Sequence, residues 1–271
     1  MIAGVGRIPG LGKAFRRIAR LYREGSVVSI RSGPLAGYQW KRSHRYVNGY
    51  WLGIYELQIQ SCLVRELRRG HVFYDVGANA GFFTLLGSQC VGPAGKVFSF
   101  EPLPENAASV RSQLELNAIT NATVVTAAVT DCAGKIEFCQ GQDTSTAHIR
   151  QPDESRQTTE TLTVDAVTLD EFVRTAPAPD FIKMDIEGAE LNALEGAKDL
   201  LGSANAPNLL IEFHGEDIQQ QAAKLLTHFG YQFCSLEGIR SRTMPRDRHV
   251  LCVAHRRRDA VAQEVHTDRG L

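Results

Sequence analysis

Short apolar runs alternate with segments of helical periodicity along most of the chain. The runs are rich in Val, Ile and Phe and predict buried strands, at residues 72–76, 96–101, 122–129, 181–186, 208–214, 231–236 and 248–254. Between them, apolar residues recur every three or four positions and predict helices, at residues 50–67, from 82–86 onward, and at 105–117, 169–175, 188–201 and 217–229. This alternation predicts an α/β fold with a doubly wound, mostly parallel seven-stranded sheet, whose last strand returns antiparallel.

Residues 1–49 precede this repeat and predict an extension made of an amphipathic helix and a small hairpin. The helix, over residues 1–24, carries Arg7, Lys13, Arg16, Arg17, Arg20 and Arg23 on a basic face and Ile8, Leu11, Phe15, Ile18, Leu21 and Tyr22 on an apolar one. It either lies on an anionic membrane, near a lipid-linked substrate, or packs on its own domain with the basic face in water. The arginines exclude a secretory signal. The hairpin pairs residues 27–30 with residues 39–42.

The main domain spans residues 50–255 and is interrupted by a β-rich insertion near residues 134–165. The insertion is rich in Thr and Gln and is longer than an ordinary crossover, and its residues 143–156 predict a loop. That loop is either a lid over an acceptor or an ordinary solvated loop. Residues 256–271 form a polar tail that we expect to fray.

Composition narrows the class of protein. The 271 residues, 43% hydrophobic and 22% charged, suffice for one large globular domain. The formal net charge is zero, so we expect no nucleic-acid partner bound through its phosphates. The six cysteines form no C-x-x-C pair and predict reduced thiols in a cytoplasmic protein, and no apolar run approaches the length of a membrane span.

A turn of small residues follows the first predicted strand. Asp75 ends that strand, and Gly77, Ala78, Asn79 and then Gly81 lead into the next helix. Such a turn lets the backbone approach a nucleotide closely and offers the unpaired N–H groups of a first helical turn.

An acid follows the second predicted strand, about twenty residues beyond the first glycine of the turn. This acid is Glu101, which at such a position accepts hydrogen bonds from a ribose diol. The dinucleotide pattern G-x-G-x-x-G is absent because Asn79 occupies its second glycine position, so a nucleotide without phosphates fits better.

Three motifs together resemble those of the FkbM family of S-adenosylmethionine-dependent methyltransferases. They are DVGANAGFFT at residues 75–84, FEP at 100–102 and KMDIEGAE at 183–190, and the resemblance covers roughly residues 50–236. It implies a class I methyltransferase (Rossmann-like) fold. Enzymes of this family usually methylate hydroxyl oxygens, often of sugars or natural products. It also places Tyr55 and Glu56 near the cofactor pocket, although Glu56 is equally explained as a carboxylate at a helix start.

The predicted S-adenosylmethionine site adds two positions to the turn and the acid. Asn106 lies near the first turn of the helix after the second strand, and Ala128, beside Ala127, suits a wall against a flat adenine, although small residues in a sheet also serve packing alone. The full predicted set is Asp75, Gly77, Ala78, Asn79, Gly81, Glu101, Pro102, Asn106 and Ala128.

Polar residues gather where two later predicted strands end. Lys183, Asp185 and Glu187 alternate with apolar residues and so share one strand face, and Glu212 and His214 do the same on the neighbouring strand. Ligands of open α/β sheets bind beyond the carboxyl ends of the strands. We therefore predict Lys183, Asp185, Glu187 and His214 as catalytic residues, the alternative being a structural ion pair of Lys183 with Asp185 or Glu187.

Two chemistries remain open for this centre. Imidazoles ordinarily titrate near neutrality, so His214 would remove the acceptor proton as a general base. Alternatively, Asp185 with Glu212 or His214 would hold Mg²⁺, which orients a diol and lowers its pKa.

The function predicted from these features is O-methylation of a hydroxyl on a sugar, glycoside or other small natural product. One alternative is a non-catalytic S-adenosylmethionine-binding scaffold, which has no need of the polar strand ends. Another is a nicotinamide-dependent oxidoreductase, which needs G-x-G-x-x-G and a second domain. The expected partner is a small-molecule acceptor; a homo-oligomer and a peripheral membrane contact through the N-terminal helix are both compatible with the sequence.

Overall fold

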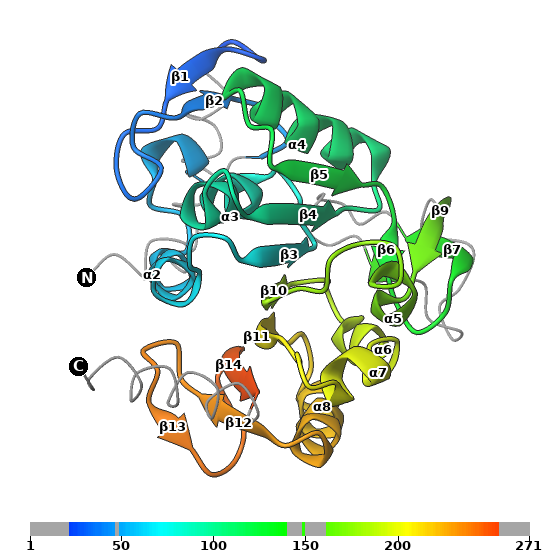
Figure 1. Ribbon diagram of the computed structural model, residues 1–271. Helices are drawn as coiled ribbons and strands as arrows, with labels where there is room; N and C mark the ends of the chain where they lie inside the picture. The colour runs from blue at the N-terminus through cyan, green and yellow to red at the C-terminus, as the bar shows by residue number, and fades with distance from the viewer. Residues whose placement is uncertain (1–21, 47–48, 140–147, 150–160, 255–271) are drawn as a thin grey trace, which may run out of the picture.

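The computed structural model describes residues 22–46, 49–139, 148–149 and 161–254, and its centre is one large sheet (Figure 1). The strands, in the order in which they pair, are β13 (Arg240–Ser241), β12 (Tyr231–Cys234), β14 (His249–Ala254), β11 (Asn208–Glu212), β10 (Phe181–Met184), β3 (Val72–Val76), β4 (Lys96–Phe100) and β5 (Ala122–Val125). Neighbours from β11 to β5 are parallel, and β14 runs antiparallel between β11 and β12. The predicted topology is confirmed, but the sheet has eight strands instead of seven because the short β13 extends its edge beyond β12.

Helices cover both faces of this sheet (Figure 1). The helices are α2 (Leu57–Glu66), α3 (Phe82–Val91), α4 (Pro104–Leu116), α5 (Leu169–Phe172), α6 (Glu190–Glu195), α7 (Lys198–Gly202) and α8 (Glu216–His228). Phe73 and Phe181 pack with residues of α2, α3 and α4, whereas their chain neighbours Tyr74 and Ile182 pack with residues of α5 to α8. Successive strand residues point to opposite faces, so strands buried on both sides need the continuous apolar runs seen in the sequence.

The predicted hairpin forms from β1 (Val27–Ser29) and β2 (Gln39–Lys41), which pair antiparallel. Side chains of α4 and of its C-cap hold it against the domain. Asn117 Oδ1 accepts the Gln39 N–H at 2.8 Å, and Gln113 Oε1 accepts another N–H of β2 at 3.0 Å. The hairpin is therefore bonded to the helical layer that contains α4.

Between β5 and β10 the chain forms a second, four-stranded sheet in the order β6-β9-β7-β8. Its strands are β6 (Ala128–Val129), β7 (Gly134–Cys139), β8 (His148–Ile149) and β9 (Thr161–Val167). The predicted loop at 143–156 lies outside the described residues apart from β8, and the tail at 256–271 lies wholly outside them. Of the predicted helix at 1–24 only residues 22–24 are described, and they are not helical. Within the described ranges, no helix combines the length and apolarity needed to cross a bilayer.

Tertiary contacts divide three elements that were predicted as continuous. The predicted helix at 50–67 begins only at Leu57, after a 3₁₀ helix η2 (Tyr50–Leu52), because Gly53 and Glu56 take positive φ values of 77° and 43°. The predicted strand at 122–129 divides, since β5 ends at Val125 and β6 pairs with β9 in the second sheet.

The predicted helix at 188–201 is likewise divided, into α6 and α7. Gly196 lies at the break and packs closely on Thr130, where an added Cβ would lie 2.1 Å from the carbonyl oxygen. The Gly196 carbonyl also accepts the Asp170 N–H at 3.0 Å, so the break is bonded to the start of α5. The spacing of apolar residues along the sequence could not reveal this contact.

Candidate active site

A pocket lies beyond the carboxyl ends of β3, β4 and β10. The predicted cofactor residues that line it are Gly77, Ala78, Asn79, Glu101, Pro102, Asn106 and Ala128. The predicted catalytic residues that line it are Lys183, Asp185 and Glu187. Asp75, Gly81 and His214 are not among the lining residues.

Three backbone N–H groups of the glycine turn after β3 donate hydrogen bonds to carbonyl oxygens of the protein itself. The N–H groups of Gly77 and Ala78 both donate to the Phe100 carbonyl at 3.0 Å, and that of Gly81 donates to Ala78 at 2.8 Å. These three N–H groups of the turn are therefore not free for a ligand. Gly77 is needed for a different reason: its φ is 84°, and a Cβ there would lie 1.9 Å from the Asp185 carbonyl oxygen.

Glu101 is the carboxylate in the pocket wall that fits a ribose. It is 4% exposed and accepts hydrogen bonds from the N–H groups of Asn79 at 2.9 Å and Leu103 at 3.0 Å, and from Asn106 Nδ2 at 3.3 Å. Burial raises the pKa of Glu101 to about 7, against the effect of these three donors. Asn79 Oδ1 is buried in the same wall with no hydrogen-bond partner among the described residues. A buried carboxylate and an unpaired acceptor fit the hydroxyl and amino donors of S-adenosylmethionine.

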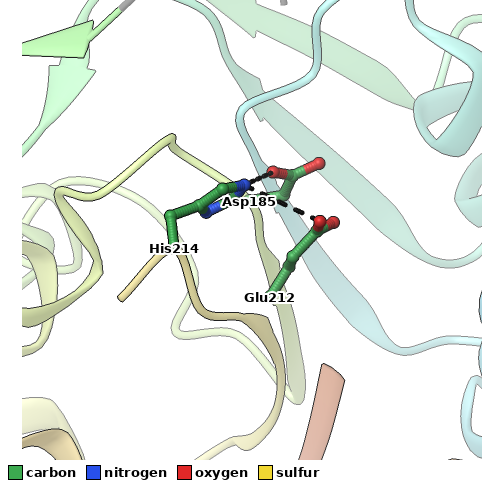
Figure 2. A group of neighbouring side chains, drawn as sticks. All are labelled: Asp185, Glu212 and His214. Atoms are coloured by element: carbon green, nitrogen blue, oxygen red, sulfur yellow. Dashed lines mark ion pairs between the residues drawn. The ribbon is translucent and has the colours of Figure 1, made fainter. Parts of the chain in front are cut away.

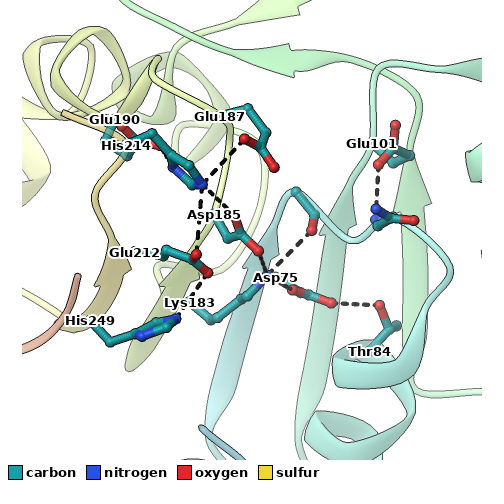
Figure 3. A network of polar contacts seen from close by, with 12 residues as sticks. Asp75, Thr84, Glu101, Lys183, Asp185, Glu187, Glu190, Glu212, His214 and His249 are labelled. Carbon is teal, nitrogen blue, oxygen red and sulfur yellow. Dashed lines mark hydrogen bonds and ion pairs between the residues drawn. The ribbon is translucent and has the colours of Figure 1, made fainter. Parts of the chain in front are cut away.

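Asp75, predicted as a cofactor residue, lies beneath the pocket and does not line it. It is fully buried, and its Oδ2 accepts a hydrogen bond from Thr84 Oγ1 at 2.7 Å (Figure 3). Thr84 Oγ1 in turn accepts one from Ser99 at 2.9 Å. Burial raises the pKa of Asp75, an effect that Lys183 and Thr84 only partly offset. Its contacts make Asp75 a counter-charge for Lys183.

Lys183 lines the pocket and lies between Asp75 and Asp185. Its Nζ donates to the Gly77 carbonyl at 3.3 Å and lies 3.5 Å from Asp185 Oδ2 and 3.7 Å from Asp75 Oδ1. Burial alone would lower the pKa of Lys183, but Asp185 and Asp75 outweigh it and leave the pKa raised. The predicted ion pair with Asp185 thus forms, and the ammonium also borders the pocket as a fixed cation, not as a base.

His214 lies among four carboxylates (Figure 3). Its Nδ1 is 2.8 Å from Glu190 Oε1, and its Nε2 is 3.3 Å from Glu187, 3.7 Å from Asp185 and 3.7 Å from Glu212. Burial alone would lower the pKa of His214, but the hydrogen bond to Glu190 and the charge of Glu187 raise it. These carboxylates favour the protonated imidazole, which makes His214 a less suitable general base than an isolated histidine.

Loops, not strands, carry most of these groups. β10 ends at Met184, so Asp185 and Glu187 follow the strand and the predicted shared strand face is wrong. Glu187 instead takes a φ of 49°, and its carboxylate lies beside His214, which itself follows the end of β11. Because β10 and β11 are parallel neighbours, their two terminal loops meet at one edge of the sheet.

Glu212 ends β11 and is held by two further side chains. His249 Nε2 lies 2.9 Å from its Oε2, and Arg248 Nε lies 2.6 Å from its Oε1. Burial alone would raise the pKa of Glu212, but His249 and Arg248 lower it to about 2. Glu56, which the resemblance placed near the pocket, borders a smaller cavity with Glu212, His249 and Lys183.

The three predicted metal ligands come together. Asp185, Glu212 and His214 offer one ligand atom each, and these atoms all lie within 4.8 Å of one another (Figure 2). Oxygen and imidazole donors at such spacing can share one cation.

Sequence reasoning assigned no role to several residues of the site. Glu190 is fully buried beside His214 and also accepts the Gly188 N–H at 3.0 Å, yet in sequence it looks like any acid in a first helical turn. The pocket is further lined by the aromatic side chains of Tyr50, Tyr55, Phe82 and Phe83. Of these, the family resemblance placed Tyr55 near the pocket, and Phe82 and Phe83 belong to the motif at residues 75–84 without an assigned role.

Comparison with known proteins agrees with this geometry. Residues 75–233 match the sequence model described as the methyltransferase FkbM domain. The hexuronic acid methyltransferase AglP of Haloferax volcanii is 25% identical over 224 residues, which cover 78% of this chain and 88% of that protein.

Solved methyltransferases are similar at lower identity. The precorrin-6y C5,15-methyltransferase of Geobacter metallireducens is 14% identical, with a TM-score of 0.44 over 73% of this chain and 86% of its own. An S-adenosylmethionine-dependent O-methyltransferase of Thermotoga maritima is 14% identical, with a TM-score of 0.43 over 89% of this chain and 79% of its own. Since the FkbM match spans more than half of the sequence, the chain belongs to the FkbM family of S-adenosylmethionine-dependent methyltransferases and has their class I fold.

Proposed function

We propose that this methyltransferase transfers the methyl group to a hydroxyl oxygen of a sugar or glycoside. The observation that carries the proposal is the reaction centre of carboxylates and an imidazole, which borders the pocket through Asp185 and Glu187 and lies apart from Glu101 (Figure 3). A hydroxyl must lose a proton during methylation, and a partly buried carboxylate beside the pocket is suited to take it.

Bound S-adenosylmethionine supplies an activated methyl group on a sulfonium, so the protein has to orient the acceptor and remove its proton. Glu101 and Asn79 would hold the cofactor through its hydroxyl and amino groups. Glu187 would accept the proton, because it lines the pocket and burial raises its pKa above that of an ordinary carboxylate.

The relative from Haloferax volcanii supports a sugar acceptor, since it is named for a hexuronic acid. The charge of the site selects the atom within such a sugar. Carboxylates border the pocket at its reactive end, and they would repel the carboxylate of a hexuronate. We therefore propose a ring hydroxyl as the acceptor atom and place the sugar carboxylate away from Asp185 and Glu187.

The test offers the chain S-adenosylmethionine with a labelled methyl group and a panel of hexuronosides, neutral hexosides and free sugars. Mass spectrometry should find a methyl ether that survives mild alkali. Transfer to no sugar, or an alkali-labile methyl ester, would overturn the proposal.

Variants then test the base. Glu187→Gln should lower turnover by about 10²–10⁴ while the affinity for S-adenosylhomocysteine stays unchanged. The control is Glu216→Gln, at an exposed glutamate in the first turn of α8. Full activity of Glu187→Gln would remove Glu187 from the mechanism. Tighter binding of NAD than of S-adenosylhomocysteine would revive the oxidoreductase, and cofactor binding without transfer to any acceptor would revive the scaffold.

A further inference from the structure

We propose that Asp185, Glu212 and His214 form a divalent-cation site that prefers a transition metal such as Mn²⁺ to Mg²⁺. The three ligand atoms lie within 4.8 Å of one another (Figure 2). Two carboxylates and one imidazole leave further coordination positions for oxygens of other molecules.

The state of His214 separates this site from an ordinary group of acids. Its side chain is 10% exposed, and Nε2 is buried without a hydrogen-bond partner among the described residues. Nδ1 is engaged by Glu190 Oε1 at 2.8 Å. A hydrogen donated from Nδ1 leaves the lone pair on Nε2, which faces Asp185 and Glu212 at 3.7 Å each. A carboxylate behind the far nitrogen is the usual arrangement for a metal-binding histidine.

The two carboxylates are held by neighbouring side chains. Lys183 Nζ lies 3.5 Å from Asp185 Oδ2, which leaves Oδ1 toward His214. His249 lies 2.9 Å from Glu212 Oε2, and Arg248 lies 2.6 Å from Oε1, the oxygen that also faces His214. Such outer contacts fix the ligands before an ion arrives.

Charge also favours a divalent ion. Four carboxylates lie within 3.7 Å of the imidazole nitrogens, and two cations, Lys183 and Arg248, pair with two of these carboxylates. Because Lys183 also pairs with Asp75, carboxylates outnumber cations around a neutral imidazole, and a divalent ion would offset this negative charge.

The donor set decides which ion. Mg²⁺ binds through oxygens and keeps several waters, whereas imidazole suits the transition metals, and Mn²⁺ accepts carboxylates as well. We therefore propose such an ion in place of Mg²⁺, which the sequence left open as one of two chemistries. The role of the ion rests on the proposed function: next to the pocket it would bind two neighbouring oxygens of the sugar and lower the pKa of the hydroxyl.

The first experiment uses the unmodified full chain after treatment with a chelator. Titration with MnCl₂ in a calorimeter should show one ion per chain, and Mg²⁺ should bind at least tenfold more weakly. Pulsed EPR of the bound Mn²⁺ should detect hyperfine coupling to an imidazole nitrogen. No saturable binding, or a signal without nitrogen coupling, would overturn the site.

The second experiment uses variants. His214→Ala should weaken Mn²⁺ binding at least tenfold. Glu190→Gln, which alters a positioning residue behind the imidazole, should weaken it by about 10–100-fold. The control Glu216→Gln should leave it unchanged. Unchanged Mn²⁺ affinity in a folded His214→Ala would overturn the assignment, and if that variant does not fold, the nitrogen coupling in the unmodified chain decides.

Methyl transfer separates this inference from the proposed function. Full transfer to a sugar in the presence of chelator would remove the ion from the reaction and leave the proposed function standing. One bound Mn²⁺ with nitrogen coupling, but no transfer to any sugar, would support the site and overturn the function.

Discussion

Replacing Lys183 with Met removes an ammonium that two acids share. Its side chain is 6% exposed, and Nζ lies 3.7 Å from Asp75 Oδ1 and 3.5 Å from Asp185 Oδ2. At an effective dielectric constant of about 20, unit charges 3.7 Å apart attract by about 4.5 kcal/mol. Breaking a buried pair by removing one partner typically costs about 3–5 kcal/mol. Because Met keeps most of the aliphatic stem, we expect Lys183→Met to lower the free energy of unfolding by about 3–5 kcal/mol at pH 7.

The loss of stability in Lys183→Met should come mainly from Asp75. This carboxylate is fully buried, and without Lys183 it would have the Thr84 hydroxyl as a donor but no counter-charge. Adding Asp75→Asn to Lys183→Met removes the uncompensated charge and should recover part of the loss. A double-mutant cycle should therefore give a coupling of about 1.5–3 kcal/mol between the two residues. Urea denaturation followed by circular dichroism measures it, with unchanged m-values as the check that both variants unfold in the same way.

The pH dependence gives a second reading of the same pair. Burial already raises the pKa of Asp75, and loss of Lys183 raises it further. A carboxyl whose pKa is raised by folding contributes stability below its unfolded pKa that is lost as the pH rises through its folded pKa. The deficit of Lys183→Met should therefore shrink as the pH falls from 7 toward the ordinary carboxyl range. A deficit under about 1 kcal/mol at pH 7, or additive effects in the cycle, would refute this account of the pair.

Three other measurements test single contacts. Affinity for S-adenosylmethionine should rise with pH through about 7, because ribose hydroxyls donate to ionised Glu101. Calorimetry at pH 6 in two buffers should show proton release on binding. The absence of proton release would contradict this role of Glu101. Thr84→Val should lower the free energy of unfolding by about 1.5–3 kcal/mol, because Asp75 loses its hydroxyl donor. Thr84→Ser keeps the hydroxyl and should lower it by under about 1 kcal/mol. Urea denaturation compares the two variants, and equal losses would exclude the hydroxyl as the cause. Gly77→Ala should lower turnover at least about tenfold, since its Cβ would lie 1.9 Å from a carbonyl oxygen of the loop after β10. Gly70→Ala is the kinetic control, with a similar positive φ and open space, and equal rates in the two variants would reject the steric explanation.

The strands were predictable because burial on both faces leaves a direct trace in the sequence. Phe73 and Tyr74 pack on opposite helical layers, so the whole run had to be apolar. The helix breaks left no such trace. Gly196 divides α6 from α7 because of its contact with the Thr130 carbonyl, more than sixty positions earlier in the chain. Periodicity measures which face is buried and cannot measure what approaches that face.

The residues of the site also divide into those that the sequence predicted and those that it missed. Glu101 and Asn79 were predictable because strand ends and turns set their positions, and both line the pocket. Asp75 was assigned to the cofactor, but its depth in the sheet makes it a partner of Lys183. Glu190 was missed because its role depends on His214, which follows another strand. Contacts between residues far apart in the sequence determine these roles, and the spacing of residues within one segment does not reveal such contacts.

Backbone strain explains why two of the carboxylates around His214 lie on a loop. Among the described residues, the non-glycine positions with positive φ are Glu56, Asn79, Ala118 and Glu187. Asn79 and Glu187 line the large pocket, and Glu56 borders the small cavity beside Lys183. Such conformations cost on the order of 1–3 kcal/mol each and persist where surrounding contacts determine them. At Glu187 the strained φ of 49° belongs to a loop that leaves the strand direction, and in that loop the carboxylate lies 3.3 Å from the imidazole on the neighbouring loop. The early end of β10 is therefore part of how the centre is assembled.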